Sequence, residues 1–166
     1  INLQGRVTFP IKDVNGDILG FGGRLIGPGE PKYLNPSADS YDKSATLYNL
    51  DVARDYILEC GKAVVVEGYM DVASMWSSGV RNVVASCGTA MTRRQLRLLK
   101  RFADEVYLLY DDDSSGNKSA ERVFKLLELE LFPVYVVKGL MGFDPDEYIR
   151  MFGRDNLLEV VYGAKT

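Results

Sequence analysis

The chain has 166 residues, of which 46% are hydrophobic and 26% are charged, and its formal net charge is −3. These values are typical of one globular domain with a real core, and they exclude both a disordered chain and two domains of ordinary size. No apolar run is long enough to span a bilayer, so we expect no membrane association. Because the chain begins with Ile1 rather than Met, we expect it to be a piece of a longer protein.

The chain contains no histidine and only two cysteines, Cys60 and Cys87, which are far apart in sequence. This composition excludes a structural zinc site, a serine-type triad and a histidine general base. We expect both thiols to be reduced and structural, as in a cytoplasmic protein. Transfer or hydrolytic chemistry would therefore depend on carboxylates and metal ions.

Residues 1–60 are predicted to form a small β-containing part that precedes the main domain. Two short β-type runs, Arg6–Ile11 and Ile18–Phe21, flank Asn15-Gly16, a pair that favours a tight hairpin turn. A loop rich in Gly, Pro, Asn and Ser follows, from Gly27 to about Asp42.

Residues 61–166 are predicted to alternate between strands and helices. We expect strands at Ala63–Val66, Asn82–Ser86, Val106–Tyr110 and Val134–Val137, and helices at Asp71–Ser78, from an N-cap at Thr92 through Phe102, at Lys118–Leu131, and from Pro145 onward. This alternation predicts an α/β fold with a mainly parallel sheet flanked by helices.

Acidic residues follow three of the predicted strands: Glu67 and Asp71 after the first, Asp111 and Asp113 after the third, and Asp144 and Asp146 after the fourth. In open α/β sheets, ligands bind at the carboxyl ends of the strands. Carboxylates that converge there repel one another unless cations neutralise them. Oxygen-only ligands suit Mg²⁺ or Mn²⁺, so the pattern favours a divalent metal site.

The spacing within two of these groups supports the metal interpretation. In an extended Asp-x-Asp, alternate side chains point to the same side, so Asp111 and Asp113 are predicted to share a metal cluster. Asp144 and Asp146, stiffened by Pro145, are expected to repeat that arrangement. Each pair alone is also typical of capped loops and helix N-termini, and the combination of three acidic groups favours the metal site.

Glu67 followed by Asp111 and Asp113 resembles the Toprim domain that topoisomerases and bacterial-type DNA primases share. Other motifs are similar to the primases in particular: Phe9-Pro-Ile-Lys-Asp13, Gly20-Phe-Gly-Gly-Arg24, Pro31-Lys-Tyr-Leu-Asn35 and Leu47-Tyr48 before the Toprim part, then Glu67-Gly-Tyr-Met-Asp-Val72, Val84-Ala-Ser86, Gly88-Thr-Ala90 and Asp144-Pro-Asp146 within it. The similarity covers nearly the whole chain. Departures are Asp111-Asp-Asp113 in place of Asp-Gly-Asp, Asp42 in place of a usual His, and Ser44-Ala45 in place of Gly-Arg.

The resemblance implies a catalytic-core fragment of a DNA primase, the polymerase that makes short RNA primers on single-stranded DNA from ribonucleoside triphosphates. It implies two or three Mg²⁺ or Mn²⁺ ions, with Glu67, Asp111 and Asp113 as catalytic and metal-binding residues and Asp71, Asp144 and Asp146 completing the metal cluster. It also implies nucleotide or template contacts by Arg24, Lys32, Tyr33, Asn35 and Lys43.

Further expectations follow from the same resemblance. The replicative helicase would bind through a region absent from this chain, the enzyme would act in the cytoplasm at the replication fork, and the isolated fragment would be weakly active or inactive. A basic face at Arg93–Arg101 is more typical of a solvated helix than of a DNA contact. Two alternatives stay open: a Toprim nuclease or topoisomerase fragment, and a non-enzymatic receiver-like α/β module.

Overall fold

The computed structural model describes residues 2–37, 41–87, 90–110 and 132–164. The elements follow in the order β1 (Arg6–Lys12), β2 (Ile18–Leu25), β3 (Tyr33–Leu34), the 3₁₀-helix η1 (Lys43–Ala45), α1 (Leu50–Cys60), β4 (Lys62–Val66), α2 (Tyr69–Ser77), β5 (Val83–Ala85), α3 (Arg93–Leu99), β6 (Glu105–Leu108), β7 (Val134–Val136), α5 (Pro145–Phe152) and α6 (Arg154–Gly163). No helix among the described residues is long and apolar enough to cross a membrane.

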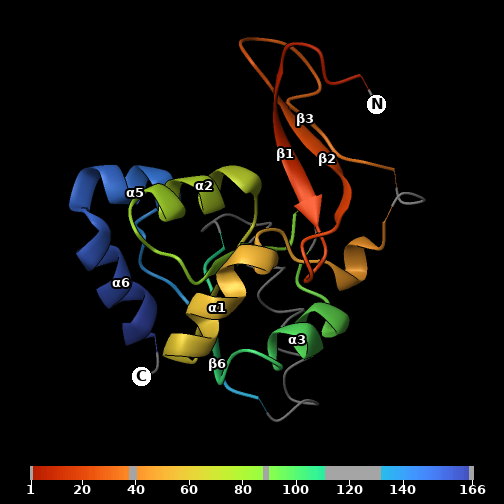
Figure 1. The fold of residues 1–166 in the computed structure, drawn as a ribbon. Helices are drawn as coiled ribbons and strands as arrows, with labels where there is room; N and C mark the ends of the chain where they lie inside the picture. The colour runs from red at the N-terminus through yellow and green to blue at the C-terminus, as the bar shows by residue number, and fades with distance from the viewer. Residues whose placement is uncertain (1, 38–40, 88–89, 111–131, 165–166) are drawn as a thin grey trace.

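The first three strands form a small antiparallel sheet in the order β1-β2-β3, which stands above one end of the helical layers in Figure 1. Strands β1 and β2 form the hairpin that the sequence predicted around Asn15-Gly16. Asp13 closes the turn, because its Oδ1 accepts hydrogen bonds from the backbone N–H of Asn15 at 2.8 Å and of Asp17 at 3.0 Å. Gly16 has a φ of 97°, which a residue without a side chain adopts easily. The short β3, inside the predicted loop, pairs Tyr33 with Arg24 of β2.

The second sheet has the order β5-β4-β6-β7, and all of its strand pairs are parallel. This confirms the predicted α/β fold class with a preceding β-hairpin segment. The central strand β4 pairs with β5 on one side and β6 on the other, so residue 67 leaves the sheet at the middle of its carboxyl edge.

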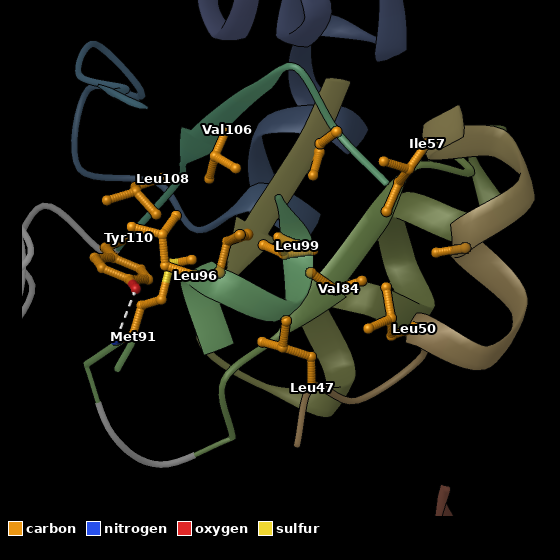
Figure 2. Close-up of a cluster of buried hydrophobic side chains, with 14 residues drawn as sticks. Leu47, Leu50, Ile57, Val84, Met91, Leu96, Leu99, Val106, Leu108 and Tyr110 are labelled. Carbon is orange, nitrogen blue, oxygen red and sulfur yellow. Dashed lines mark hydrogen bonds between the residues drawn. The ribbon is translucent and has the colours of Figure 1, made fainter. Parts of the chain in front are cut away.

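Alternating residues of β4 feed two separate cores. Val65 packs on one face with Leu50 and Ile57 of α1 and with Leu96 and Leu99 of α3. Figure 2 shows this core, in which most of the labelled side chains are aliphatic and Tyr110 lies at one end.

The opposite face of the parallel sheet is covered by other helices. Val64 and Val66 pack there with Met75 of α2, Tyr148 of α5 and Leu157 of α6, all buried. In Figure 1, α5 and α6 lie at the left and α3 at the right, with α1 between them in this view. The two-sided burial explains the unbroken apolar run of β4, since both of its faces are covered.

Several helix boundaries differ from the predicted ones. Helix α3 begins after the predicted N-cap Thr92, whose hydroxyl accepts from the N–H of Gln95 at 3.1 Å, but it ends at Leu99 rather than continuing through Phe102. The C-terminal helical region is broken at Gly153, where φ is 85°. Helix α1 had no counterpart among the predicted elements, and the helix predicted at 118–131 lies outside the described residues.

Candidate functional site

A pocket of about 530 Å³ lies where the small sheet meets the carboxyl edge of the parallel sheet. It is lined by β2, by β3 and the residues beside it, by the start of α2 and by the start of α5. In Figure 1, α2 lies between the small sheet on one side and α5 on the other. The lining residues are Arg24, Lys32, Tyr33, Asn35, Glu67, Gly68, Tyr69, Met70, Asp71, Cys87, Asp144, Asp146 and Arg150.

Glu67 and Asp71 enter the pocket from the turn between β4 and α2. Glu67 directly follows β4, and its carbonyl accepts the N–H of Cys87 at 3.0 Å, which ties this turn to the chain leaving β5. Asp71 lies in the first turn of α2, where its Oδ2 accepts the N–H of Gly68 at 2.9 Å. A carboxylate is favourable at a helix N-terminus because the unpaired N–H groups there carry partial positive charge.

Asp144 and Asp146 line the pocket from the start of α5, but their backbone is not the extended one that their spacing predicted. Asp144 is the N-cap, and its Oδ1 accepts the N–H of Glu147 at 2.7 Å, while Asp146 already lies within the first helical turn. The expectation of an extended Asp-x-Asp is therefore wrong here. Pro145 starts the helix because its fixed φ suits the first helical position.

The carboxylate of Asp146 makes two side-chain contacts. Its Oδ1 accepts a hydrogen bond from the Ser74 hydroxyl of α2 at 2.7 Å, and its Oδ2 lies 2.7 Å from an Nη atom of Arg150 in α5. The first contact links α2 to α5. Asp146 thus has donors from two elements.

Basic and polar side chains from β2, from β3 and from the residues beside β3 line the same pocket as these acids. The Arg24 guanidinium carbon lies 5.9 Å from the centre of the Tyr33 ring, so the cation stacks on the aromatic face. Burial raises the pKa of Tyr33; the nearby Arg24 lowers it, and Asp71 raises it further. Lys32 adds a second cation to the pocket lining.

Buried aromatic packing fixes the side of the pocket nearest the small sheet. The Tyr69 ring stacks on Phe9 with 4.9 Å between the ring centres, and its hydroxyl donates to Asn35 Oδ1 at 2.8 Å. A Cβ atom added at Gly22 would lie 2.8 Å from the Tyr69 ring, so only glycine leaves room for this ring against β2. The hydrogen bond to Tyr69 in turn holds Asn35 at the pocket.

One predicted site residue lies outside the pocket lining, and two others lie outside the described residues. Lys43 lies in η1, outside the pocket lining. Burial raises the pKa of the Cys87 thiol, and the charge of Lys43 opposes part of that rise. Asp111 and Asp113 lie outside the described residues. Burial raises the pKa of Tyr110, the residue immediately before them, and the charge of nearby Glu67 raises it further.

The donor set suits a hard divalent cation, because the four pocket acids offer only carboxylate oxygens. Within residues 2–37, 41–87, 90–110 and 132–164, however, no three acidic, cysteine or histidine side chains lie close enough together to hold a metal ion. A complete metal site at this edge would need further ligands. Asp111 and Asp113 are the acids that continue the chain from Tyr110 beside Glu67.

Five pocket residues were not among the predicted site residues: Gly68, Tyr69, Met70, Cys87 and Arg150. Arg150 had a signal, since it follows Asp146 by four residues on a helix and so shares its face. No sequence signal marked Cys87 as a pocket residue, because a thiol after a buried strand is an ordinary core residue. Burial raises its pKa to about 12, so the thiol is neutral and structural, whereas Cys60, also unpaired with another cysteine, is exposed.

The basic helix α3 lies away from the pocket lining. Arg94 is paired with Asp42, the acid that stands where the resembling family usually has His, and Asp42 also accepts the N–H of Ser44 at 2.9 Å. Asp42 therefore serves to cap η1 and to attach it to α3.

Two protein families match the chain, in consecutive segments. The family described as Toprim-like matches residues 64–149, which is more than half of the chain, and the family described as the N-terminal domain of the DNA primase catalytic core matches residues 2–54. The DNA primase of Aquifex aeolicus is 43% identical over 161 residues, and that of Clostridium acetobutylicum is 40% identical over 163 residues. These alignments cover 94% and 97% of this chain but only 32% and 27% of those primases.

Solved structures agree in fold along nearly the whole chain. The zinc-binding and RNA polymerase domains of the Aquifex aeolicus primase match with a TM-score of 0.89 and 41% identity, over 98% of this chain and 41% of that one. A DnaG primase catalytic domain bound to single-stranded DNA matches with a TM-score of 0.89 and 35% identity, over 96% of this chain and 53% of that one. The chain spans 32% and 27% of the length of the two curated relatives named above.

Proposed function

This chain belongs to the Toprim-like family, and from that premise we propose that it is part of the catalytic core of a bacterial-type DNA primase. The observation that carries the proposal is the composition of the pocket. Acids from the Toprim-like segment face Arg24 and Lys32 from the segment that matches the primase N-terminal core. A polymerase site needs both, because it binds cations and an anionic nucleotide together.

The proposed reaction is nucleotidyl transfer to a growing RNA primer. The primer 3′-oxygen forms a bond to the α-phosphorus of a ribonucleoside triphosphate, the bond from that phosphorus to the bridging oxygen breaks, and pyrophosphate leaves. The hydroxyl proton passes to solvent. Two or three Mg²⁺ or Mn²⁺ ions, when bound, would lower the pKa of the hydroxyl and neutralise charge on the leaving pyrophosphate.

The chain's own residues would hold the reactants in place. We assign metal binding to Glu67, Asp111 and Asp113 as the central acids, with Asp71, Asp144 and Asp146 completing the cluster. Asp71 and Asp144 already accept backbone N–H groups, so each carboxylate is oriented before any cation binds. Such prior orientation reduces the reorganisation needed during the reaction.

The opposite wall would bind the phosphates and the strand. Arg24 and Lys32 neutralise nucleotide or template phosphates, Arg24 through a planar fork of N–H donors. Tyr33 and Asn35 lie beside them, and Tyr33 offers a ring face to a base or sugar. Lys43 would act from outside the pocket lining, so we expect it to contact the strand rather than the reacting nucleotide.

The partners follow from the same assignment. We propose that the template is single-stranded DNA, as in the primase structure named above, and that the substrates are ribonucleoside triphosphates. Helicase binding would belong to a region outside this chain. We also propose a functional division between residues 1–60 and 61–166, because the pocket takes Arg24 and Lys32 from the first part and its four described acids, with Arg150, from the second.

A Toprim nuclease or topoisomerase would share the acids but not the facing wall. The segment at residues 2–54 matches a primase core, and that segment supplies Arg24. A receiver-like switch does not require a basic wall opposite its acids. The primase assignment therefore explains more of the pocket than either alternative does.

Mn²⁺ titration tests the metal site without depending on catalysis. Isothermal titration calorimetry should show Mn²⁺ binding to the wild-type chain and at least about tenfold weaker binding to Asp111→Asn/Asp113→Asn, because two oxygen ligands lose their charge. The matched control is Asp17→Asn/Asp55→Asn, which makes the same charge change at two exposed sites away from the pocket. Equal Mn²⁺ affinity for the wild type and the Asp111/Asp113 variant would reject this metal site.

A further inference from the structure

Arg150 has a place in the pocket that the metal-and-phosphate assignment does not explain. It lies in α5 one turn after Asp146, and its guanidinium is 2.7 Å from Asp146 Oδ2. The other oxygen of Asp146 accepts the Ser74 hydroxyl at 2.7 Å. A guanidinium therefore already neutralises a carboxylate that lines the proposed metal pocket.

This contact opposes cation binding at Asp146. A divalent cation approaching the carboxylate meets a positive charge less than 3 Å from one of its oxygens, and two cations on one carboxylate repel each other. The Arg150 and Asp146 side chains are 66% and 44% exposed. An ion pair so open to water is weak, so a competing cation can displace the guanidinium at little cost.

Ser74 differs from Arg150 in what it can do when a cation arrives. Its hydroxyl is neutral and comes from α2, so it can keep its bond to Asp146 Oδ1 while the charge at Oδ2 changes. The carboxylate would then stay fixed between α2 and α5, and only the long Arg150 side chain would move.

Once displaced from Asp146, the Arg150 guanidinium could contact a polyphosphate bound in the pocket. The pocket's other lining cations, Arg24 and Lys32, stand on the β2–β3 wall, whereas Arg150 stands on the α5 wall. A polyphosphate bound between the walls could be contacted from both sides. The guanidinium fork suits such oxygens because it can donate two parallel hydrogen bonds.

We propose that Arg150 is an exchange residue that couples divalent cation binding to nucleotide binding. It contacts Asp146 when no cation is bound, and it contacts the phosphates of a nucleoside triphosphate when a cation takes its place at Asp146. The inference rests on the proposed function, because it requires that the pocket bind both ligands. Cation and nucleotide must then strengthen each other's binding by the same factor, since such coupling is reciprocal.

The experiment measures two affinities for the wild-type chain, Arg150→Met, Arg150→Lys and the control Arg154→Met. Mn²⁺ affinity is measured by calorimetry without nucleotide. The affinity for a fluorescent, non-hydrolysable ATP analogue is measured in EDTA and again at saturating Mn²⁺. Arg154 is a suitable control because it is exposed, pairs with Asp155 and lies outside the pocket lining. Far-ultraviolet circular dichroism checks that each variant is folded.

Arg150→Met should bind Mn²⁺ about two- to fivefold more tightly than the wild type, since an exposed competing ion pair is lost. In EDTA its affinity for the analogue should equal that of the wild type, because Arg150 is then held by Asp146. At saturating Mn²⁺ it should bind the analogue at least about fivefold more weakly than the wild type. Arg150→Lys should keep part of the increase in analogue affinity that Mn²⁺ causes in the wild type. Arg154→Met should match the wild type in its affinity for Mn²⁺ and in its affinity for the analogue under both conditions.

Other results reject the exchange. Unchanged or weaker Mn²⁺ binding by Arg150→Met would mean that Arg150 does not compete at Asp146. An equal loss of analogue affinity in EDTA and in Mn²⁺ would make Arg150 a permanent phosphate contact, and no loss in either would make it an ordinary helix ion pair. A wild-type chain that binds neither ligand would reject the proposed function as well, whereas a wild type that binds both confines the failure to this inference.

Discussion

Asp144 and Asp146 have the same type of side chain but different structural roles. Asp144 caps α5 through Glu147 N–H, and Asp146 bridges α2 and α5 through Ser74, while both line the pocket. The sequence contained a signal for the helix start, since Asp-Pro-Asp-Glu places a capping residue, a proline and an N3 glutamate in order. The helix predicted from Pro145 onward is confirmed. The extended interpretation of Asp144 and Asp146 was wrong because it conflicted with that helix start.

The position of Glu67 was predictable from sequence for a different reason. An apolar run that ends in an acid and a glycine marks the carboxyl end of a buried parallel strand, and ligands bind at that edge. The contact between Asp146 and Ser74 was not predictable. It joins residues 72 positions apart, and only the packing of α5 against α2 brings them together.

Tyr110 gives the fold a pH dependence at the alkaline end. Burial raises its pKa to about 12, although the Met91 N–H, which donates to its hydroxyl at 3.2 Å, opposes the rise. Unfolded tyrosine has a pKa of about 10, so the unfolded state loses the proton first. The contribution to stability is therefore complete below about pH 10 and is lost as pH rises through about 12, by up to about 1.4 kcal/mol per pH unit.

Urea denaturation at several pH values between 8 and 11.5 measures this loss. Replacing Tyr110 with Phe removes the titrating hydroxyl and keeps the ring, so the free energy of unfolding should fall less steeply above pH 10 than in the wild type. The two proteins are compared by slope because lysines and other buried tyrosines titrate in both. Identical slopes would show that Tyr110 ionises as easily in the folded state as in the unfolded state.

At the scale of elements, strand β4 was the easiest to predict. Its run of valines is typical of a strand in a sheet that is buried on both faces. Helix α1 was missed, although Gly61 follows it in the left-handed conformation that commonly ends helices. Strand β3 was also missed. Two residues are too few to show a period, and their strand character comes from pairing with Gly23 and Arg24 of β2.

Gly22 in β2 is where the small sheet and α2 meet most closely. Alanine there would place its Cβ 2.8 Å from the Tyr69 ring, so the ring would have to shift from its stack on Phe9. We expect Gly22→Ala to lower the free energy of unfolding by about 1–3 kcal/mol, as overpacking usually does. Urea denaturation monitored by tryptophan fluorescence gives the value.

Gly163 provides the matched control, since a Cβ there meets no atom within 4 Å. Gly163→Ala should be neutral or stabilise by up to about 1 kcal/mol, because alanine favours the helix more than glycine does. If Gly22→Ala were as stable as Gly163→Ala, the close packing of Tyr69 against β2 would not matter to the fold.

For the whole molecule, the pocket depends on bringing two dissimilar parts together. Composition and periodicity predicted the parallel sheet and its acidic edge, and they also predicted a hairpin before it. They said nothing about how the hairpin sheet sits on that edge. The contacts that place it there, such as Tyr69 with Phe9 and Asn35, join residues far apart in sequence whose partners carry no local signal. The facing of acids and cations was expected only through the resemblance to primases.

Primer synthesis by the complete protein, wild type against Glu67→Gln, tests the central claim most directly. The substrate is single-stranded DNA with ribonucleoside triphosphates and Mg²⁺, and the control is Glu59→Gln, the same change at an exposed position in α1. Because Glu67 stands at the centre of the acidic edge, its loss should lower the rate of primer synthesis by at least about a hundredfold with folding unchanged. Primer synthesis by Glu67→Gln at the rate of Glu59→Gln would contradict the placement of the catalytic centre in this pocket.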